Sequence, residues 1–295
     1  MAGRDDFLVS TDWLASSLGR FELRILECTV LLLPRDDGQP GYAVVSGRDG
    51  WAAGHIPGAG FADIPYDLSD RVQPLRFMMP GPEQFAAAMG AYGIGPDSDV
   101  VLYDRAGNMW AARVWWMLRA FGFDNARILD GGWPTWVEEG RPVATDHVAP
   151  APAEFRARPR AGLIASKDDV LGAMARDNVC VVNALNPAQY RGDVAPYGRA
   201  GHIPASVNVP AMGSAGVVDP RTQKYHAVEE IKRRFVEAGA RPGERMITYC
   251  GGGIAASSAA FAAVMAGYTD VAVYDASLSE WAADPSLPMA TKPRA

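Results

Sequence analysis

Cys250 is the residue whose setting most clearly suggests covalent chemistry. It ends an apolar run, Met246–Tyr249, and is followed by three glycines and then an alanine-rich segment that the pattern predicts to be a helix. Glycines let successive backbone amides turn toward one point, and a helix N-terminus adds partial positive charge. Such amides stabilise a thiolate, the nucleophilic form of cysteine. The sequence therefore predicts that a sulfur anion is held by the residues that follow: Gly251, Gly252, Gly253, Ile254, Ala255 and Ala256.

The alternative is that Cys250 is an inert core residue and the glycines merely form a tight turn. That interpretation suits the other two cysteines better, because Cys28 and Cys180 lie inside apolar, strand-like runs, and free cysteine is often buried. Three cysteines without C-x-x-C spacing also argue against a disulfide framework and against a zinc site. We expect one nucleophilic cysteine, no metal and no cofactor.

Composition excludes several classes of protein. The chain has 295 residues, 48% of them hydrophobic and 21% charged, and a net charge of −6, which fits a folded protein of two domains. A nucleic-acid-binding protein would carry a basic stripe, and a membrane span would need about 20 consecutive apolar residues. The sequence has neither, and residues 1–10 do not resemble a leader peptide. We expect a cytoplasmic protein that binds neither nucleic acid nor membranes.

The sequence repeats itself with a long period. The motif Gly-His-Ile-Pro occurs at 54–57 and again at 201–204, the run before Cys250 has a counterpart at Val101–Tyr103, and Trp136 corresponds to Trp281. These pairs are 145 to 147 residues apart, which is too long for a solenoid repeat and predicts two similar domains in tandem. Asp104 occupies the cysteine position of the first domain. A larger offset near the start of each half predicts about nine extra residues in the first domain, within Pro34–Gly50.

The predicted elements alternate within each half. Strands are expected at Leu23–Thr29, Asp99–Tyr103, Arg127–Asp130, Val179–Ala184, Met246–Tyr249 and Val271–Tyr274, and helices at Ala111–Ala120 and Ala255–Ala266. This alternation predicts an α/β fold in which each domain is a parallel sheet with helices on both faces. Ligands of such sheets bind beyond the carboxyl ends of the strands, where Asp104 and Cys250 lie. We expect one domain at 1–145, an extended proline-rich linker at 146–160 and a second domain at 161–295.

Together these motifs resemble the tandem-domain sulfurtransferases of the rhodanese family over essentially the whole chain. The resemblance rests on the following stretches: both Gly-His-Ile-Pro motifs, the helix at Arg113–Arg119, the turn at Asp130–Trp133, the cysteine loop and the ending at Asp275–Trp281. It implies two rhodanese-like domains, of which the first is non-catalytic and the second carries the nucleophile. It also implies a two-step transfer, in which Cys250 takes a sulfane sulfur from thiosulfate or 3-mercaptopyruvate as a persulfide and passes it to cyanide or a thiol.

The resemblance also suggests roles for other residues. Arg191 lies in a Tyr-Arg-Gly motif that matches the family, and Arg191 and Arg199 are expected to bind the negative end of the donor. His55 and His202 occur in both halves, including the half without a cysteine, so we expect them to be structural. Phosphatases of the same fold carry Cys-x5-Arg, but the sixth residue after Cys250 is Ala256, so a phosphate would lack its guanidinium partner. The helix residues Trp115 and Trp116 are expected in the core and at the domain interface.

Several positions depart from the family pattern. Asn183 and Leu185 stand where the family usually has Asp and Arg, and Ala276 and Leu278 stand where it has Gly and Trp. If the turn needs a positive φ at Ala276, the alanine would cost on the order of 1 kcal/mol. The intact cysteine loop favours an enzyme. The four departures favour the alternative, a non-catalytic sulfur carrier or interaction module that retains the fold.

The choice of donor depends on the loop. The mercaptopyruvate enzymes of the family typically have Cys-Gly-Ser-Gly and the vertebrate thiosulfate enzymes Cys-Arg-Lys-Gly, whereas this loop is Cys-Gly-Gly-Gly. The Asp and His that mercaptopyruvate enzymes often carry in the first domain have Pro65 and Phe77 as their nearest counterparts. Without that Ser and His, thiosulfate is slightly favoured. The expected partners are a small anionic sulfur donor and a thiol or cyanide acceptor.

Overall fold

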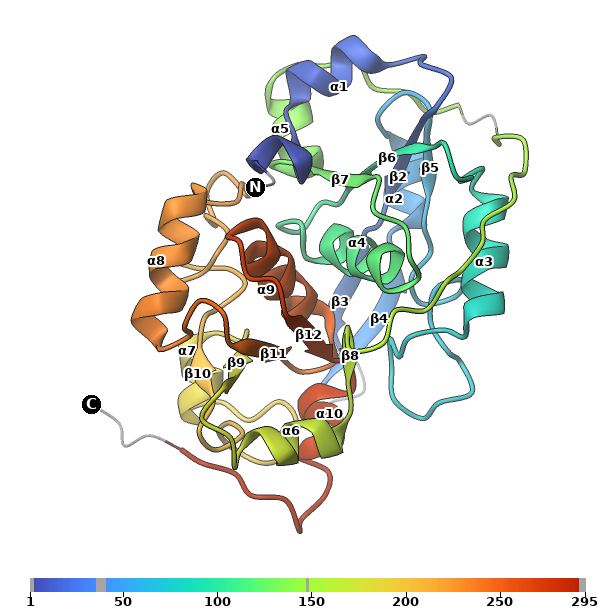
Figure 1. The fold of residues 1–295 in the computed structure, drawn as a ribbon. Helices are drawn as coiled ribbons and strands as arrows, with labels where there is room; N and C mark the ends of the chain where they lie inside the picture. The colour runs from blue at the N-terminus through green and yellow to red at the C-terminus, as the bar shows by residue number, and fades with distance from the viewer. Residues whose placement is uncertain (1–2, 36–40, 147–148, 292–295) are drawn as a thin grey trace.

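The computed structural model describes residues 3–35, 41–146 and 149–291 and contains two domains, each with a five-stranded parallel sheet (Figure 1). The first domain comprises a short 3-10 helix at Arg4–Asp6, β1 (Leu8–Val9), α1 (Thr11–Ser17), β2 (Leu23–Glu27), β3 (Val30–Pro34), β4 (Tyr42–Ser46), α2 (Arg48–Ala53), β5 (Ala59–Phe61), α3 (Pro82–Ala91), β6 (Asp99–Tyr103), α4 (Met109–Ala120), β7 (Ala126–Leu129) and α5 (Gly132–Glu138). The second comprises β8 (Ile164–Ala165), α6 (Lys167–Ala173), β9 (Val179–Asn183), α7 (Pro187–Arg191), β10 (Val207–Asn208), α8 (Val228–Ala238), β11 (Arg245–Tyr249), α9 (Ile254–Met265), β12 (Val271–Tyr274) and α10 (Ser277–Trp281).

The two sheets have the same strand order. It is β1-β7-β6-β2-β5 in the first domain and β8-β12-β11-β9-β10 in the second, so each strand occupies the place of its repeat partner. The predicted α/β fold with two similar domains is confirmed. The central strands β6 and β11 end immediately before Asp104 and Cys250, which places these two residues at the carboxyl edge of their sheets, as predicted.

Helices cover both faces of the first sheet because side chains of a strand alternate in direction. Val100 and Leu102 of β6 join the large core that includes α3 and α4. Val101 and Tyr103 of the same strand join a separate cluster with α1 and α5. All four side chains are fully buried, which explains why this strand reads as a continuous apolar run.

The extra length of the first domain is an antiparallel hairpin. Strands β3 and β4 pair with each other before α2, close to the predicted position at Pro34–Gly50. The two domains also differ in length at a second place, where the second domain is the longer one. In the first domain the Gly-His-Ile-Pro motif follows α2 directly, whereas in the second domain residues 192–200 separate α7 from the motif. The second domain therefore has an insertion of its own, which sequence analysis missed because the two length differences partly cancel.

Residues 149–160 of the proline-rich segment form neither helix nor strand and are docked on the first domain. The amide of Ala153 donates to the carbonyl of Gly90 at 3.0 Å, and that of Arg158 donates to the carbonyl of Phe121 at 2.8 Å. Phe155 is buried against Phe85, with ring centroids 5.6 Å apart. The segment thus adds to the core of the first domain instead of hanging free between the two.

Helices α4 and α9 pack against each other in the centre of the molecule, between the two sheets (Figure 1). Trp115 of α4 meets Phe261 of α9 edge to face, with centroids 4.8 Å apart. Trp116 is fully buried, and its indole N–H donates to the carbonyl of Leu163 at 3.2 Å. The expected role of both tryptophans in the core and the domain interface is confirmed.

Candidate active site

Cys250 lies at the bottom of a loop that the following turn holds in place. Its amide donates to the Ser277 hydroxyl at 3.0 Å, and its carbonyl accepts from Leu278 at 3.1 Å. The Ser277 hydroxyl also accepts from the Gly253 amide at 3.3 Å, and Gly253 begins α9 in a left-handed conformation with φ 79°. Cys250 is 3% exposed, so only a narrow part of it faces solvent. The loop is rigidly held around a nearly buried thiol.

The first domain shows what such a loop binds. The carboxylate of Asp104 accepts four backbone hydrogen bonds: from Ala106 and Asn108 at 2.8 and 2.9 Å, and from Trp110 and Ala111 at 2.8 and 3.0 Å. Burial raises the pKa of Asp104, and these four bonds oppose the shift. Among the described residues, the groups that hydrogen-bond to the carboxyl group at the cysteine position are therefore backbone amides.

The two loops can be aligned at the N-cap residues of the helices that follow them. Asn108, with φ 63°, is the left-handed N-cap of α4, as Gly253 is of α9. Between the strand and this cap the first domain has one residue more, so the repeat offset changes from 146 to 145 inside the loop. The counterparts of the donors Trp110 and Ala111 are therefore Ala255 and Ala256, whose amides lie in the first turn of α9.

Segments of the first domain complete the wall of the cysteine loop. Arg113 of α4 is fully buried, and its guanidinium lies 2.6 Å from the carboxylate of Asp275. It also donates to the carbonyl of Phe77 at 2.6 Å, while the amide of Met79 donates to Asp275 at 2.7 Å. A Cβ on Gly253 would lie 2.8 Å from the same Asp275 carboxylate. This buried ion pair joins the two domains beside the loop.

In the same way, residues of the second domain cover the Asp104 loop of the first domain. The side-chain oxygen of Gln223 accepts from the Gly107 amide at 3.0 Å, and its carbonyl accepts from the Asn108 side chain at 2.8 Å. A Cβ on Gly107 would overlap the methyl group of Met212. Gln223 and Phe77 are repeat partners, and both have a positive φ, of 55° and 64°. Each domain thus covers the other's loop, and the Asp104 loop is closed.

The departure from the family pattern at Asn183 is accompanied by a second difference, in the cysteine loop. In the first domain, Glu27 occupies the same place in the sheet and pairs with Arg105 at 2.6 Å, the residue directly after Asp104. The counterpart of Arg105 is Gly251. Acid and arginine are therefore absent together, and no charge is left unpaired. The ring of Tyr197 fills the place beside Gly251, where a Cβ would overlap it.

The positive φ in the last turn falls on Ser277, at 52°, and Ala276 has φ −68°. The expected strain at Ala276 is therefore not present. Ser277 takes this conformation while its hydroxyl bridges the Cys250 loop to the carbonyl of Tyr274 at 2.8 Å. Leu278 is buried and donates its amide to Cys250, so the replacement of Trp leaves this backbone contact intact.

The two arginines suggested for donor binding have protein partners. Arg191 forms an ion pair with Asp193 at 2.8 Å, and its side chain is 41% exposed. Arg199 donates to the carbonyls of Asp284 and Leu287 at 2.8 and 2.6 Å. The structure gives no contact between either guanidinium and the described residues of the cysteine loop. Both arginine residues are partly buried, and both guanidinium groups are engaged by the protein.

The remaining candidates are structural in this fold. His55 stacks on Trp51, and its Nδ1 lies 2.8 Å from the Trp51 carbonyl; His202 stacks on Tyr190 and makes the same contact at 2.7 Å. Burial raises the pKa of Cys28, and burial with the charge of Glu244 raises the pKa of Cys180 to about 11. Both of these thiols stay protonated at neutral pH and are poor nucleophiles.

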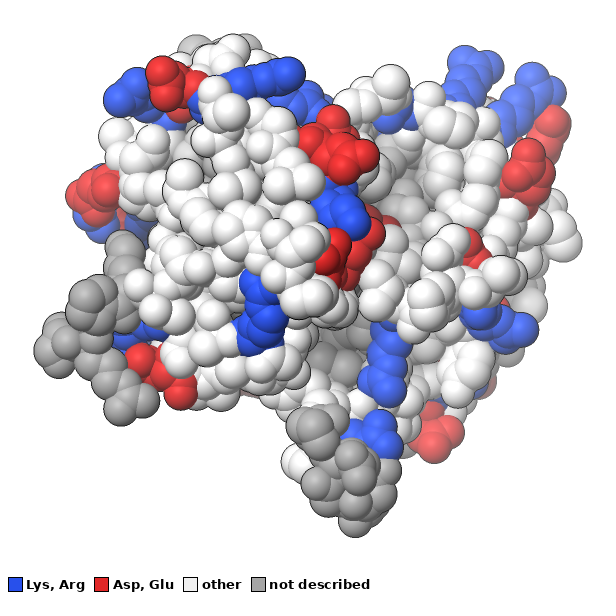
Figure 2. Space-filling view, turned by 90° about the horizontal axis from the view of Figure 1, so that it is seen from below, with Lys and Arg blue, Asp and Glu red and all other residues white. Residues whose placement is uncertain are grey.

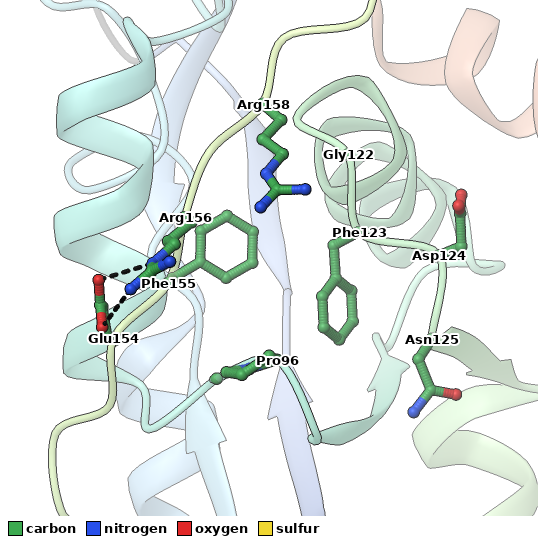
Figure 3. Close-up of a pocket in the computed structure, with 10 residues that line it drawn as sticks. Pro96, Gly122, Phe123, Asp124, Asn125, Glu154, Phe155, Arg156 and Arg158 are labelled. Carbon is green, nitrogen blue, oxygen red and sulfur yellow. Dashed lines mark hydrogen bonds and ion pairs between the residues drawn. The ribbon is translucent and has the colours of Figure 1, made fainter.

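Two of the pockets in the structure differ in the chemistry that their lining residues allow. One of about 660 Å³ lies between the first domain and the docked segment and is lined by Phe123, Phe155 and Arg158 among others, with the Glu154–Arg156 pair at its side (Figure 3). Its lining contains no cysteine, so it offers no thiol for sulfur transfer. Another, of about 610 Å³, lies at the domain junction beside Ser279, whose hydroxyl donates to the Gly251 carbonyl at 2.7 Å. The cysteine loop is therefore a better candidate for the active site than the pocket of about 660 Å³.

Within the described residues, no helix is long and apolar enough to cross a membrane. In the same part of the chain, no three His, Cys, Asp or Glu side chains are grouped so that they could hold a metal ion. The face shown in Figure 2 is hollowed between its two halves, and basic and acidic side chains are interspersed on a largely uncharged surface.

Comparisons with known proteins agree with the two-domain fold. The family model for the rhodanese-like domain matches residues 12–139 and 166–284. The chain belongs to the rhodanese family. It is 33% identical over 281 residues to the thiosulfate sulfurtransferase of Gallus gallus, covering 93% of this chain and 92% of that protein. It is 37% identical to the 3-mercaptopyruvate sulfurtransferase of Homo sapiens, covering 77% and 76% of the two chains.

The crystal structure of SseA from Escherichia coli, a 3-mercaptopyruvate sulfotransferase by its description, superposes on this rhodanese with a TM-score of 0.80. The two are 30% identical, and the match covers 92% of this chain and 98% of the other. With relatives of this kind over nearly its whole length, the protein is a sulfurtransferase with two rhodanese-like domains.

Proposed function

We propose that Cys250 is the nucleophile of this sulfurtransferase and carries the transferred sulfur as a persulfide. The single observation that supports this best is the carboxylate of Asp104, which occupies the equivalent loop and accepts four backbone hydrogen bonds. By the alignment of the helix N-caps, the amides of Ala255 and Ala256 in the second-domain loop correspond to two of these donors. A persulfide anion placed there is stabilised by hydrogen bonds and by the N-terminus of α9, and no metal or cofactor is required.

The transfer has two steps. The Cys250 thiolate attacks the outer sulfur of the donor; a new S–S bond forms, the donor's bond to that sulfur breaks, and the leaving group departs with the electron pair. With thiosulfate the leaving group is sulfite. Cyanide or a thiolate then attacks the terminal sulfur, takes it up, and returns the electron pair of the S–S bond to Cys250. Atoms and charge balance with the donor and the acceptor alone.

For the donor we propose thiosulfate ahead of 3-mercaptopyruvate. The loop lacks the hydroxyl of Cys-Gly-Ser-Gly, and Phe77, the nearest counterpart of the first-domain histidine, has an apolar ring that packs against Trp110 and cannot transfer a proton. A proton relay to Cys250 through side chains at these positions is therefore absent. Thiosulfate needs none, because sulfite leaves as an anion. The charge of the donor is met by loop amides and by Arg191, whose side chain is 41% exposed.

We also propose the cytoplasm as the compartment, because all three cysteines are free and the reaction requires a reduced thiol. The boundaries 1–145 and 161–295 serve as the proposed domain limits. The docking of Phe155 on Phe85 supports keeping the segment around Phe155, residues 149–160, with the first domain when domains are expressed separately.

Mass spectrometry and a cyanide assay test the proposal together. After treatment with thiosulfate, the intact protein should gain one sulfur atom on the peptide that contains Cys250, and cyanide should remove it with the formation of thiocyanate. Cys250→Ser should gain none, while Cys28→Ser and Cys180→Ser keep the activity. Parallel rates with 3-mercaptopyruvate decide the donor. A sulfur adduct without turnover would favour a carrier over an enzyme, and full activity of Cys250→Ser would exclude the mechanism.

A further inference from the structure

Tyr197 lies directly on the cysteine loop. It belongs to segment 192–200, which the first domain lacks between its helix and the Gly-His-Ile-Pro motif. A Cβ built on Gly251 would overlap the ring and the hydroxyl oxygen of Tyr197. Gly251 does not have a positive φ, so its backbone conformation does not require glycine. The phenol is what excludes a side chain at this position.

The first domain shows what stands in this place when the phenol is missing. There the residue after Asp104 is Arg105, whose guanidinium pairs with Glu27, donates to the carbonyl of Gly50 at 3.0 Å and lies over the ring of Trp133 at 4.3 Å. The second domain has replaced each side chain of this set, with Gly251, Asn183 and Leu278 as the counterparts of Arg105, Glu27 and Trp133. The second domain has thus exchanged a cation for a phenol beside its reactive residue.

The surroundings keep the phenol protonated. Burial raises the pKa of Tyr197, and the nearby Cys250 and Tyr42 raise it further. Tyr42 is on the hairpin of the first domain, and its carbonyl accepts from Arg76 at 2.6 Å. The carbonyl of Arg76 lies 4.0 Å from the place of a Cβ on Gly252. The hydroxyl of Tyr197 is therefore a neutral hydrogen-bond donor at the point where both domains meet the loop.

We propose that Tyr197 is a positioning residue for the sulfur donor: its hydroxyl donates a hydrogen bond to the donor's anionic group, and its ring makes glycine obligatory at position 251. The proposal rests on Cys250 as the site of transfer. A neutral phenol can bind the sulfonate group without offering the thiolate a competing cation. The chemical class of ligand is a small anion with a sulfane sulfur next to its charged group, as in thiosulfate.

Steady-state kinetics of Tyr197→Phe test the hydroxyl. Removing one hydrogen bond to a charged group should raise the KM for thiosulfate about tenfold, with kcat changed less than twofold at saturating thiosulfate. The rate at which cyanide removes the sulfur from a preloaded persulfide should not change, because that step does not use the donor's anion. Tyr66→Phe, at an exposed tyrosine outside the site, is the matched control. An unchanged KM for thiosulfate in Tyr197→Phe overturns the role of the hydroxyl.

A double-mutant cycle tests the steric part. Gly251→Ala should lower kcat/KM at least tenfold, and adding Tyr197→Ala should remove most of that further loss, so that the double variant resembles Tyr197→Ala alone. In the matched cycle, Gly252→Ala and Tyr197→Ala should act additively, since a Cβ on Gly252 meets nothing closer than 3.8 Å. Additive effects in the Gly251 cycle overturn the proposal.

Folding provides a second readout of the same cycle. If Gly251→Ala does not fold, the double variant with Tyr197→Ala should fold, and failure of both counts against the proposal. Absence of a persulfide in the wild-type protein would instead reject Cys250 as the nucleophile, whereas normal persulfide formation with unchanged Tyr197 variants rejects only the present inference.

Discussion

The buried ion pair between Arg113 and Asp275 should contribute strongly to stability, and only as a pair. It joins the two domains beside Cys250, with the Arg113 side chain fully buried and that of Asp275 5% exposed. Arg113→Met keeps most of the volume but leaves the carboxylate of Asp275 with the Met79 amide as its hydrogen-bond donor. Asp275→Asn leaves the guanidinium of Arg113 without its counter-charge.

The magnitude follows from burial. Removing one partner of a buried ion pair costs about 3–5 kcal/mol, because an uncompensated charge remains in a medium of low polarity. Replacing both partners removes that penalty, so the double variant Arg113→Met/Asp275→Asn should cost clearly less than the sum of the single variants. The first domain offers a matched control. Asp130, the repeat partner of Asp275, pairs with Arg4 at 2.7 Å, but the Arg4 side chain is 31% exposed, so Arg4→Met should cost about 1 kcal/mol.

Urea denaturation of the four variants and the wild type, followed by fluorescence and by the cyanide assay, gives the free energies of unfolding. A coupling energy of more than about 1 kcal/mol between Arg113 and Asp275 supports the reasoning. Single variants that each cost less than the Arg4→Met control would refute it, because burial would then not govern the strength of these pairs.

Three further predictions concern other parts of the molecule. Asp104→Cys should form no second persulfide by mass spectrometry, because Gln223 and Met212 close the first-domain loop; two sulfur atoms per chain would contradict this. Arg191→Ala should raise the KM for thiosulfate up to about tenfold, with Arg191→Lys restoring only part, and an unchanged KM would make Arg191 a surface residue. The pKa of Cys180 is raised to about 11, so the native state holds its proton more tightly than the unfolded state does. Its contribution to stability is complete below about pH 9 and is lost as the pH rises toward 11, and Cys180→Val should flatten the stability curve in that window.

Much of the fold could be predicted from the sequence because its signals are local or repeated. The β6 strand, Asp99–Tyr103, and the β12 strand, Val271–Tyr274, are found at the predicted residues, since runs of buried residues in parallel strands are apolar throughout. The sequence repeat identified Asp104 as the equivalent of Cys250, and it indicated where the first domain has its extra residues. These predictions depended on pattern and spacing alone.

The contacts around the site could not be predicted in the same way. Tyr197 lies in an insertion of the second domain, which the repeat spacing did not reveal because the first domain has a longer insertion. Its contact with Gly251 depends on the folded chain and leaves no pattern in the sequence. The pairing of Glu27 with Arg105 joins residues 78 positions apart, so the joint loss at Asn183 and Gly251 could not be recognised as one change. The positive φ fell on Ser277 and not on Ala276, because the hydroxyl of Ser277 holds the cysteine loop.

The reciprocal covering of the two loops makes each half of the molecule depend on the other. Asp275 receives the Met79 amide from the first domain, and Asp130 receives the Tyr225 amide from the second at 2.9 Å. A second domain produced alone would lose Arg113 and the wall that Phe77 provides, and α9 would expose Phe261 to water. The half that carries Asp104 therefore cannot be removed without opening the Cys250 loop, because Arg113, Phe77 and Met79 lie beside that loop and are encoded there.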